Sequence, residues 1–233
     1  MLKINSEVFF EFCDQKLIVS AFNQNSKKIY SNEISLINED KFIDKINNEI
    51  ITNIFNIEKV LDHQINFLNI ILNLKKSFNI KFNISKKKGE EINSYNDVTY
   101  LIQDARSYIL KYYKSYSILH IIIDNYYFDL KKYNKLVFEK NFNTFSIDLN
   151  FICYPINEIN EFKKIFAKNN LSINKFICFE YLKNISKNND VLEEDVHSLA
   201  YNFALGQNLD EVEIVPKKHK NRGFFEKLLD YLK

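Results

Sequence analysis

The sequence predicts a mixed α/β fold that carries one insertion, and three observations support this. Runs of alternating apolar and polar residues, typical of strands, occur beside runs with apolar residues three and four positions apart, typical of helices. The two kinds of run are interleaved, and a strand-helix-strand-strand block interrupts the larger pattern. A chain of 233 residues with 46% hydrophobic and 15% aromatic residues can also bury a core and a smaller subdomain.

The N-terminal third begins with strands and continues into a helix. Three short alternating runs (EVFFEFC, KLIVSAF and KKIYSNE) occupy residues 7–33 and are separated by DQ and NQNS, which predicts an antiparallel meander. In residues 40–61 isoleucines recur at intervals of three and four, which predicts a helix with one apolar face. The apolar run INFLNIILNL, residues 65–74, is then a candidate buried strand.

The middle of the chain holds the block that we interpret as an insertion. Residues 78–85 (FNIKFNIS) alternate as a strand does, and a helix follows with Ser94 or Asn96 as its cap. Two more strands are predicted, SILHIII at 117–123 and SIDLNFICY at 146–154, with a loop rich in Lys and Asn between them. The C-terminal part predicts a helix, a strand and a last helix, at residues 157–170, 173–180 and 191–205 respectively.

The composition argues against several functional classes. The 32 basic and 30 acidic residues nearly cancel, which excludes the strong positive field of a dedicated nucleic-acid binder. The four histidines are scattered and the three cysteines lie far apart, so we expect no metal site and no disulfide. No Ser-His-Asp or Cys-His set can be proposed from spacing, so we expect no enzyme activity. No export signal or bilayer-spanning apolar run is found.

One stretch resembles a known family. Residues 118–129 (ILHIIIDNYYFD) are similar to a strand region of the bacterial cell-division actin homologue FtsA, with Leu119, His120, Tyr126 and Asp129 at the matching positions. Residues 146–180 parallel the strand, helix and strand that lead back into the first lobe of that family. The resemblance implies a single actin-like (ribonuclease-H-like) lobe with an inserted α+β (SHS2-like) subdomain and a C-terminal amphipathic helix.

The same resemblance bears on nucleotide binding. The segment FEFCDQKLIV looks like the first phosphate-binding hairpin of the family, in which Glu11 keeps an acidic position. Cys13 stands where the family has glycine and Asp14 where it has a hydroxyl residue, so the backbone loses its close approach to phosphate and gains a repelling charge. The sequence also stops where the second lobe of the family begins. We therefore expect a degenerate site with no bound cofactor and no ATPase activity.

The resemblance also sets the expected domain boundaries. We expect the actin-like lobe at 1–82 and 155–205, the inserted subdomain at 83–154, a linker with a basic run at 206–222, and an amphipathic membrane helix at 223–233.

The C-terminal tail is the candidate membrane-binding site. Placed on a helical wheel, its apolar and charged residues separate onto two faces, directly after a basic run. Two other interpretations remain open: a helix that packs on the protein's own core, and a basic run that is simply solvated or binds nucleic acid. The expected membrane contacts are Lys217, Lys218, Lys220, Arg222, Phe224, Phe225, Leu228, Leu229, Tyr231 and Leu232.

These features together predict a scaffold of the cell-division machinery on the inner face of the cytoplasmic membrane, held there by anionic lipids. The resemblance implies the tubulin-like protein FtsZ as a partner, and late division proteins or a second copy as partners of the inserted subdomain. The alternative is an actin-like, membrane-associated scaffold of pilus or secretion assembly.

Overall fold

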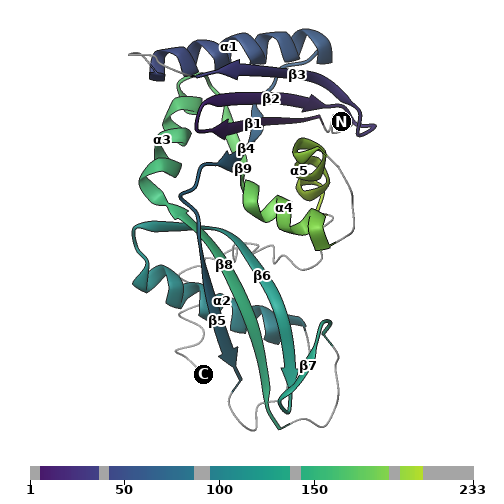
Figure 1. The fold of residues 1–233 in the computed structure, drawn as a ribbon, viewed down its shortest axis with the longest axis vertical. Helices are drawn as coiled ribbons and strands as arrows, with labels where there is room; N and C mark the ends of the chain where they lie inside the picture. Colours follow the sequence, from purple (N-terminus) through teal and green to yellow (C-terminus); the bar gives the residue numbers. More distant parts are fainter. Residues whose placement is uncertain (1–5, 37–41, 87–94, 137–142, 189–194, 207–233) are drawn as a thin grey trace, which may run out of the picture.

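The computed structural model describes residues 6–36, 42–86, 95–136, 143–188 and 195–206, which form two sheets with helices packed against them (Figure 1). The first sheet has the strand order β3-β2-β1-β4-β9. Strands β1, β2 and β3 form an antiparallel meander, whereas β4 pairs in parallel with both β1 and β9. Its strands are β1 (Glu7–Cys13), β2 (Lys16–Phe22), β3 (Lys28–Ser35), β4 (Phe67–Asn73) and β9 (Ser172–Cys178).

Helices cover both faces of this sheet (Figure 1). Helices α1 (Phe42–Leu61) and α3 (Ile156–Ala167) lie on one face, where they pack with β1 residues such as Phe10. Helices α4 (Phe179–Asn188) and α5 (Val196–Ala204) lie on the other face, where they pack with residues such as Phe9. Because successive side chains of a strand point to opposite faces, all five residues of β1 from 8 to 12 are buried.

The second sheet has one helix on one face. Its strand order is β5-β8-β6-β7, and all its pairs are antiparallel. Helix α2 (Tyr95–Tyr112) packs on the face that carries Phe145, Ile147 and Leu149. The opposite face carries polar residues such as Asp148, as the alternating sequence of β8 predicts. Its strands are β5 (Phe78–Ser85), β6 (Tyr116–Phe128), β7 (Lys131–Tyr133) and β8 (Phe145–Pro155).

The two sheets are joined through β8 and β6. Strand β8 runs directly into α3, and Tyr154 near its end is fully buried in the core of the first sheet. On β6, His120 is buried, its Nε2 atom accepts the backbone N–H of Cys178 at 2.9 Å, and its ring lies 4.5 Å from that of Tyr181. His120 is therefore a hydrogen-bonded histidine at the junction of the two sheets.

The mixed α/β class is confirmed, but two predicted details are wrong. The strand predicted to run to residue 180 ends at Cys178, and α4 follows at once, although no helix was predicted between residues 180 and 191. The Lys- and Asn-rich loop contains β7, because the chain reverses at Asp129 and Leu130. Both residues have positive φ, of 46° and 67°, a conformation that usually calls for glycine or asparagine, so this turn has no typical turn residues by which it could be predicted.

The predicted insertion boundaries at 83 and 154 stay predictions; the second sheet itself begins at Phe78 and ends at Pro155. Within the ranges that the structure describes, no helix has both the length and the apolar character needed to cross a membrane.

Candidate functional site

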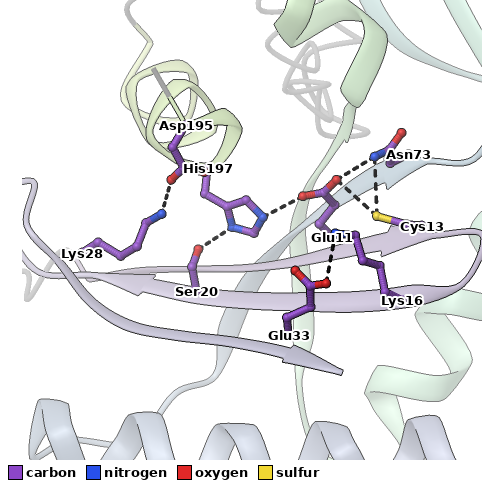
Figure 2. A network of polar contacts seen from close by, with 9 residues as sticks. All are labelled: Glu11, Cys13, Lys16, Ser20, Lys28, Glu33, Asn73, Asp195 and His197. Carbon is purple, nitrogen blue, oxygen red and sulfur yellow. Dashed lines mark hydrogen bonds and ion pairs between the residues drawn. The ribbon is translucent and has the colours of Figure 1, made fainter. Parts of the chain in front are cut away.

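The candidate site lies around the β1–β2 hairpin, where the sequence places Glu11, Cys13 and Asp14. Glu11 points from β1 toward α5 and is only 3% exposed. Both of its carboxylate oxygens are engaged (Figure 2): Oε2 lies 2.8 Å from His197 Nε2, and Oε1 accepts hydrogen bonds from Asn73 Nδ2 at 2.7 Å and from the Cys13 thiol at 3.3 Å. Burial alone would raise the pKa of Glu11, but the hydrogen bonds from His197 and Asn73 outweigh burial and hold the pKa below its ordinary value.

His197 connects α5 to the sheet through both ring nitrogens. It stands at the start of α5 and is 3% exposed. Because an ionised carboxylate can only accept, Nε2 donates to Glu11, and Nδ1 shares a hydrogen bond with the Ser20 hydroxyl over 2.5 Å (Figure 2). The three buried polar side chains of Glu11, His197 and Ser20 thus satisfy one another, and we call them the Glu11–His197–Ser20 bridge.

The bridge has the residue types of a hydrolytic triad but not the access. Ser20 is 1% exposed and sits in the middle of β2, under α5. Neither Ser20 nor His197 lines the pocket at the hairpin. A nucleophile must reach its substrate, so this arrangement serves to dock α5 on the sheet.

Sequence reasoning missed this bridge because Ser20 and His197 are 177 residues apart. The one local signal was a polar residue inside each of two apolar runs, LIVSAF and VHSLAYNFA. A second, exposed contact lies beside the bridge, where Lys28 forms an ion pair with Asp195, the residue that precedes α5 (Figure 2).

A pocket of about 400 Å³ opens at the hairpin itself. It lies where β1 and β4 end and α4 begins, and its walls carry both charges: Asp14 and Glu180, and Lys16 and Lys75. Lys16 also pairs with Glu33 at 3.1 Å across the β2–β3 pair. Asp14 is exposed at the turn, as expected for a carboxylate placed at the hairpin tip.

Cys13 lies between the pocket and Glu11. Burial and the neighbouring Glu11 carboxylate raise the pKa of its thiol to about 12, so the thiol is protonated at neutral pH. A protonated thiol is a poor nucleophile and a poor metal ligand. Over the described ranges, no group of three or more His, Cys, Asp or Glu side chains is arranged so that it could hold a metal ion.

The predicted membrane-binding residues, Lys217 to Leu232, lie outside the described residues, so the membrane helix stays a prediction.

Comparison with known proteins gives matches in structure alone. No protein-family model matches the chain. No curated protein matches it either. Among solved structures, one described as the PilM-PilN type IV pilus biogenesis complex is similar with a TM-score of 0.49 and 7% identity, over 76% of this chain and 48% of that chain.

Two further structures are similar over comparable stretches. The cytoplasmic domain of EpsL, an inner membrane component of the type II secretion system of Vibrio cholerae, gives a TM-score of 0.36 at 9% identity, covering 75% of this chain and 56% of that chain. A Bacteroides thetaiotaomicron protein with an actin-like ATPase fold and unknown function gives 0.34 at 11% identity, covering 81% of this chain and 60% of that chain.

This chain therefore spans between about half and three fifths of the length of those chains. The first two descriptions concern pilus and secretion systems, and none of the three names FtsA.

Proposed function

We propose that this chain is a membrane-associated scaffold built on an actin-like lobe, and that it binds partner proteins without turning over a nucleotide. The observation that carries the proposal is the state of Glu11. This acidic side chain of the hairpin is buried, and both of its oxygens are hydrogen-bonded to the chain's own groups, so it is not available to a metal or a phosphate-bound water.

The topology of the first sheet supports the actin-like lobe. Its order β3-β2-β1-β4-β9, with an antiparallel meander and then two parallel strands, is the arrangement expected of a ribonuclease-H-like core. The second sheet and α2 fall between β4 and α3 along the chain, where the resemblance expects the inserted subdomain.

The charges around the pocket support the absence of nucleotide turnover. The resemblance would place phosphates at the hairpin tip, where Asp14 is exposed and Glu180 stands across the pocket. These two carboxylates would repel a polyphosphate, and Lys16 is partly neutralised by Glu33.

Calorimetric titration with ATP and Mg²⁺ tests this part of the proposal. We expect no heat above that of dilution for the natural chain. The matched variant carries Cys13→Gly and Asp14→Thr, which restores the residue types of the family hairpin. A dissociation constant in the micromolar range for the natural chain would overturn the proposal, whereas binding by the variant alone would show that these two side chains disable the site.

Attachment to a membrane is the second part of the proposal, and it depends on residues 217–233. Sedimentation with vesicles that contain anionic lipid should pellet the full chain weakly, because an apolar helical face and a basic run each add only moderate affinity. Phe225→Asp with Leu229→Asp should abolish this binding, and changing Lys217, Lys218 and Lys220 to Gln should weaken it and reduce its salt dependence. If deleting residues 223–233 unfolds the protein and leaves vesicle binding intact, the helix belongs to the core.

Binding to a partner protein distinguishes between the two assemblies in which the scaffold would act. A cell-division role requires binding to FtsZ, so an immobilised full chain should capture purified FtsZ. A pilus or secretion role is the other candidate, and failure to capture FtsZ under conditions where the chain is folded would count against the division assembly.

A further inference from the structure

The two edges of the second sheet differ in how well they are protected against further pairing. At one edge, β7 is only three residues long, and a short edge strand offers little backbone to a new partner. At the other edge, β5 has eight residues that pair regularly with β8, without a bulge and without proline. Within the ranges that the structure describes, no strand pairs with the outer side of β5.

The backbone of β5 offers a regular set of hydrogen-bonding groups on that outer side. Directly after β5, Lys86 donates its N–H to Phe145 of β8, so residues of even number face β8. Because hydrogen-bonded residues alternate along an antiparallel strand, the amides and carbonyls of Asn79, Lys81, Asn83 and Ser85 point away from β8.

Aromatic side chains of α2 flank the same edge. Tyr108 and Tyr112 are 49% and 60% exposed, and their rings lie 4.5 Å apart. The ring of Tyr108 lies 5.3 Å from Phe82 of β5, which places this exposed flank beside β5 instead of β7. An added strand would therefore find hydrogen-bonding groups and apolar surface together, as in strand-addition interfaces.

We propose that β5 pairs antiparallel with β5 of a second copy of this chain, which joins two four-stranded sheets into one of eight strands. The pairing does not depend on the scaffold function proposed above and goes beyond it. The occupant is a second copy, and not an unrelated peptide, because β5 is complementary to itself in one register.

That register is centred on Phe82. Residues directly opposite each other in an antiparallel pair lie on the same face of the sheet. In a symmetric pair of β5 strands, even-numbered residues must therefore lie opposite even-numbered residues, and odd-numbered residues opposite odd-numbered ones. Centring on Lys81 would set two lysines directly opposite, which is unfavourable. Centring on Phe82 pairs residues 79–85 of the two strands and places Phe82 directly opposite Phe82 of the second copy. Tyr108 and Tyr112 of both copies then lie on one face of the joined sheet.

The charges agree with this register. In it, Lys81 lies opposite Asn83 of the second copy. Within each copy, Asp148 of β8 lies directly opposite Asn83, and Asn83 Nδ2 donates a hydrogen bond to its carboxylate at 2.7 Å. Each lysine therefore stands in the row that contains Asp148 of the other copy, and two such rows form about the symmetry axis.

Sedimentation equilibrium of the full chain over a range of concentrations tests the proposal. We expect a concentration-dependent dimer. Asn83→Pro removes an N–H that points away from β8, so the variant should fold, but the dimer loses one main-chain hydrogen bond from each copy. Its dissociation constant should rise about tenfold or more. Asn83→Ala keeps the N–H and is the matched control; it should still dimerise. Circular dichroism establishes that both variants are folded.

Oxidative cross-linking tests the register. A mixture of Lys81→Cys and Asn83→Cys chains should cross-link faster than either variant alone. A natural chain that is monomeric at all concentrations would overturn the proposal, and so would a dimer that folded Asn83→Pro leaves unchanged. Equal cross-linking of the mixture and the single variants would overturn the Phe82-centred register.

Discussion

The two sheets differ in how many of their faces are covered by helices. The first sheet forms most of the buried core, whereas the second leaves one face exposed to solvent or to a partner. The first sheet lies between α1 and α3 on one face and α4 and α5 on the other. The second sheet has α2 on one face and polar side chains on the other. A strand covered on both faces contributes nearly all its side chains to the core, whereas a strand covered on one face leaves half of them for solvent or for a partner.

The polar side chains show the same contrast. In the first sheet, the Glu11–His197–Ser20 bridge is buried under α5. In the second, Asp148 accepts hydrogen bonds from Asn83, Asn125 and Tyr127 on the open face. A polar group in a buried network loses more when its partner is removed, because water cannot replace that partner.

The largest effect is expected at the centre of the doubly covered sheet. Phe10 is fully buried, and its ring lies 5.3 Å from that of Phe166 on α3. Phe10→Ala should lower the free energy of unfolding by about 3–5 kcal/mol, measured by urea denaturation. Phe82→Ala on the edge strand β5 should cost about 1–2 kcal/mol, because its ring is only partly buried. Equal costs would contradict the contrast between the sheets.

The next effect is expected at the buried bridge. His197→Ala leaves the Glu11 carboxylate and the Ser20 hydroxyl without their partner, and should cost about 3 kcal/mol. Asp148→Ala should cost about 1 kcal/mol, because water reaches the groups that it leaves. Both values come from chemical denaturation. If the two substitutions cost the same, the bridge is more hydrated than its burial implies.

A pH dependence sharpens the same comparison. The pKa of Glu11 lies below its ordinary value of 4.5, so the unfolded chain binds more protons there than the folded protein does. Stability should therefore fall as the pH drops below about 4.5, and Glu11→Gln should make that fall shallower. The pKa of Asp148 is also lowered, where hydrogen bonds from Asn83 and Tyr127 outweigh its desolvation. Its exposure weakens the coupling to stability, so Asp148→Asn should change the slope less. Denaturation series from pH 6 to pH 3 would contradict this if the Asp148 variant had the larger effect.

The smallest effect is expected at the exposed end of α5. Lys28 pairs with Asp195 and lies 5.7 Å from the ring centre of Phe22. Lys28→Gln should cost less than about 1 kcal/mol, because solvent screens an exposed ion pair. A loss of stability as large as that of His197→Ala, in the same denaturation assay, would show that the Lys28–Asp195 ion pair holds α5 on the sheet more than the Glu11–His197–Ser20 bridge does.

The sequence predicted most of the elements because apolar periodicity is strong in both sheets. In β5 and in residues 145–150 of β8, apolar and polar residues alternate clearly, and α1 repeats isoleucine at helical spacing. Helix α4 was missed because KFICFEYL continues a strand-like run across the boundary at Cys178. Strand β7 was missed because its turn uses Asp129 and Leu130 at positive φ, without a glycine.

The site was predicted only in part. The hairpin follows from a local alternating pattern and the acidic position of Glu11 from the resemblance to the family hairpin, and the structure places them beside a pocket. The partners of Glu11 do not follow from it, because Asn73 and His197 come from distant parts of the chain, 62 and 186 residues away. Such a network depends on the tertiary packing of α5, and single-sequence periodicity carries no information about it.

The continuity of β8 with α3 has a mechanical consequence for a protein that would join other proteins. Tyr154 anchors the end of β8 in the core of the first sheet, and the N–H of Cys178 on β9 is bonded to His120 on β6. A force applied along β8 would be carried as shear by its hydrogen bonds to β5 and β6, instead of being absorbed by bending at a linker. Tension between a partner held at the β5 edge and the first sheet would therefore load the hydrogen bonds between β8 and its two neighbouring strands.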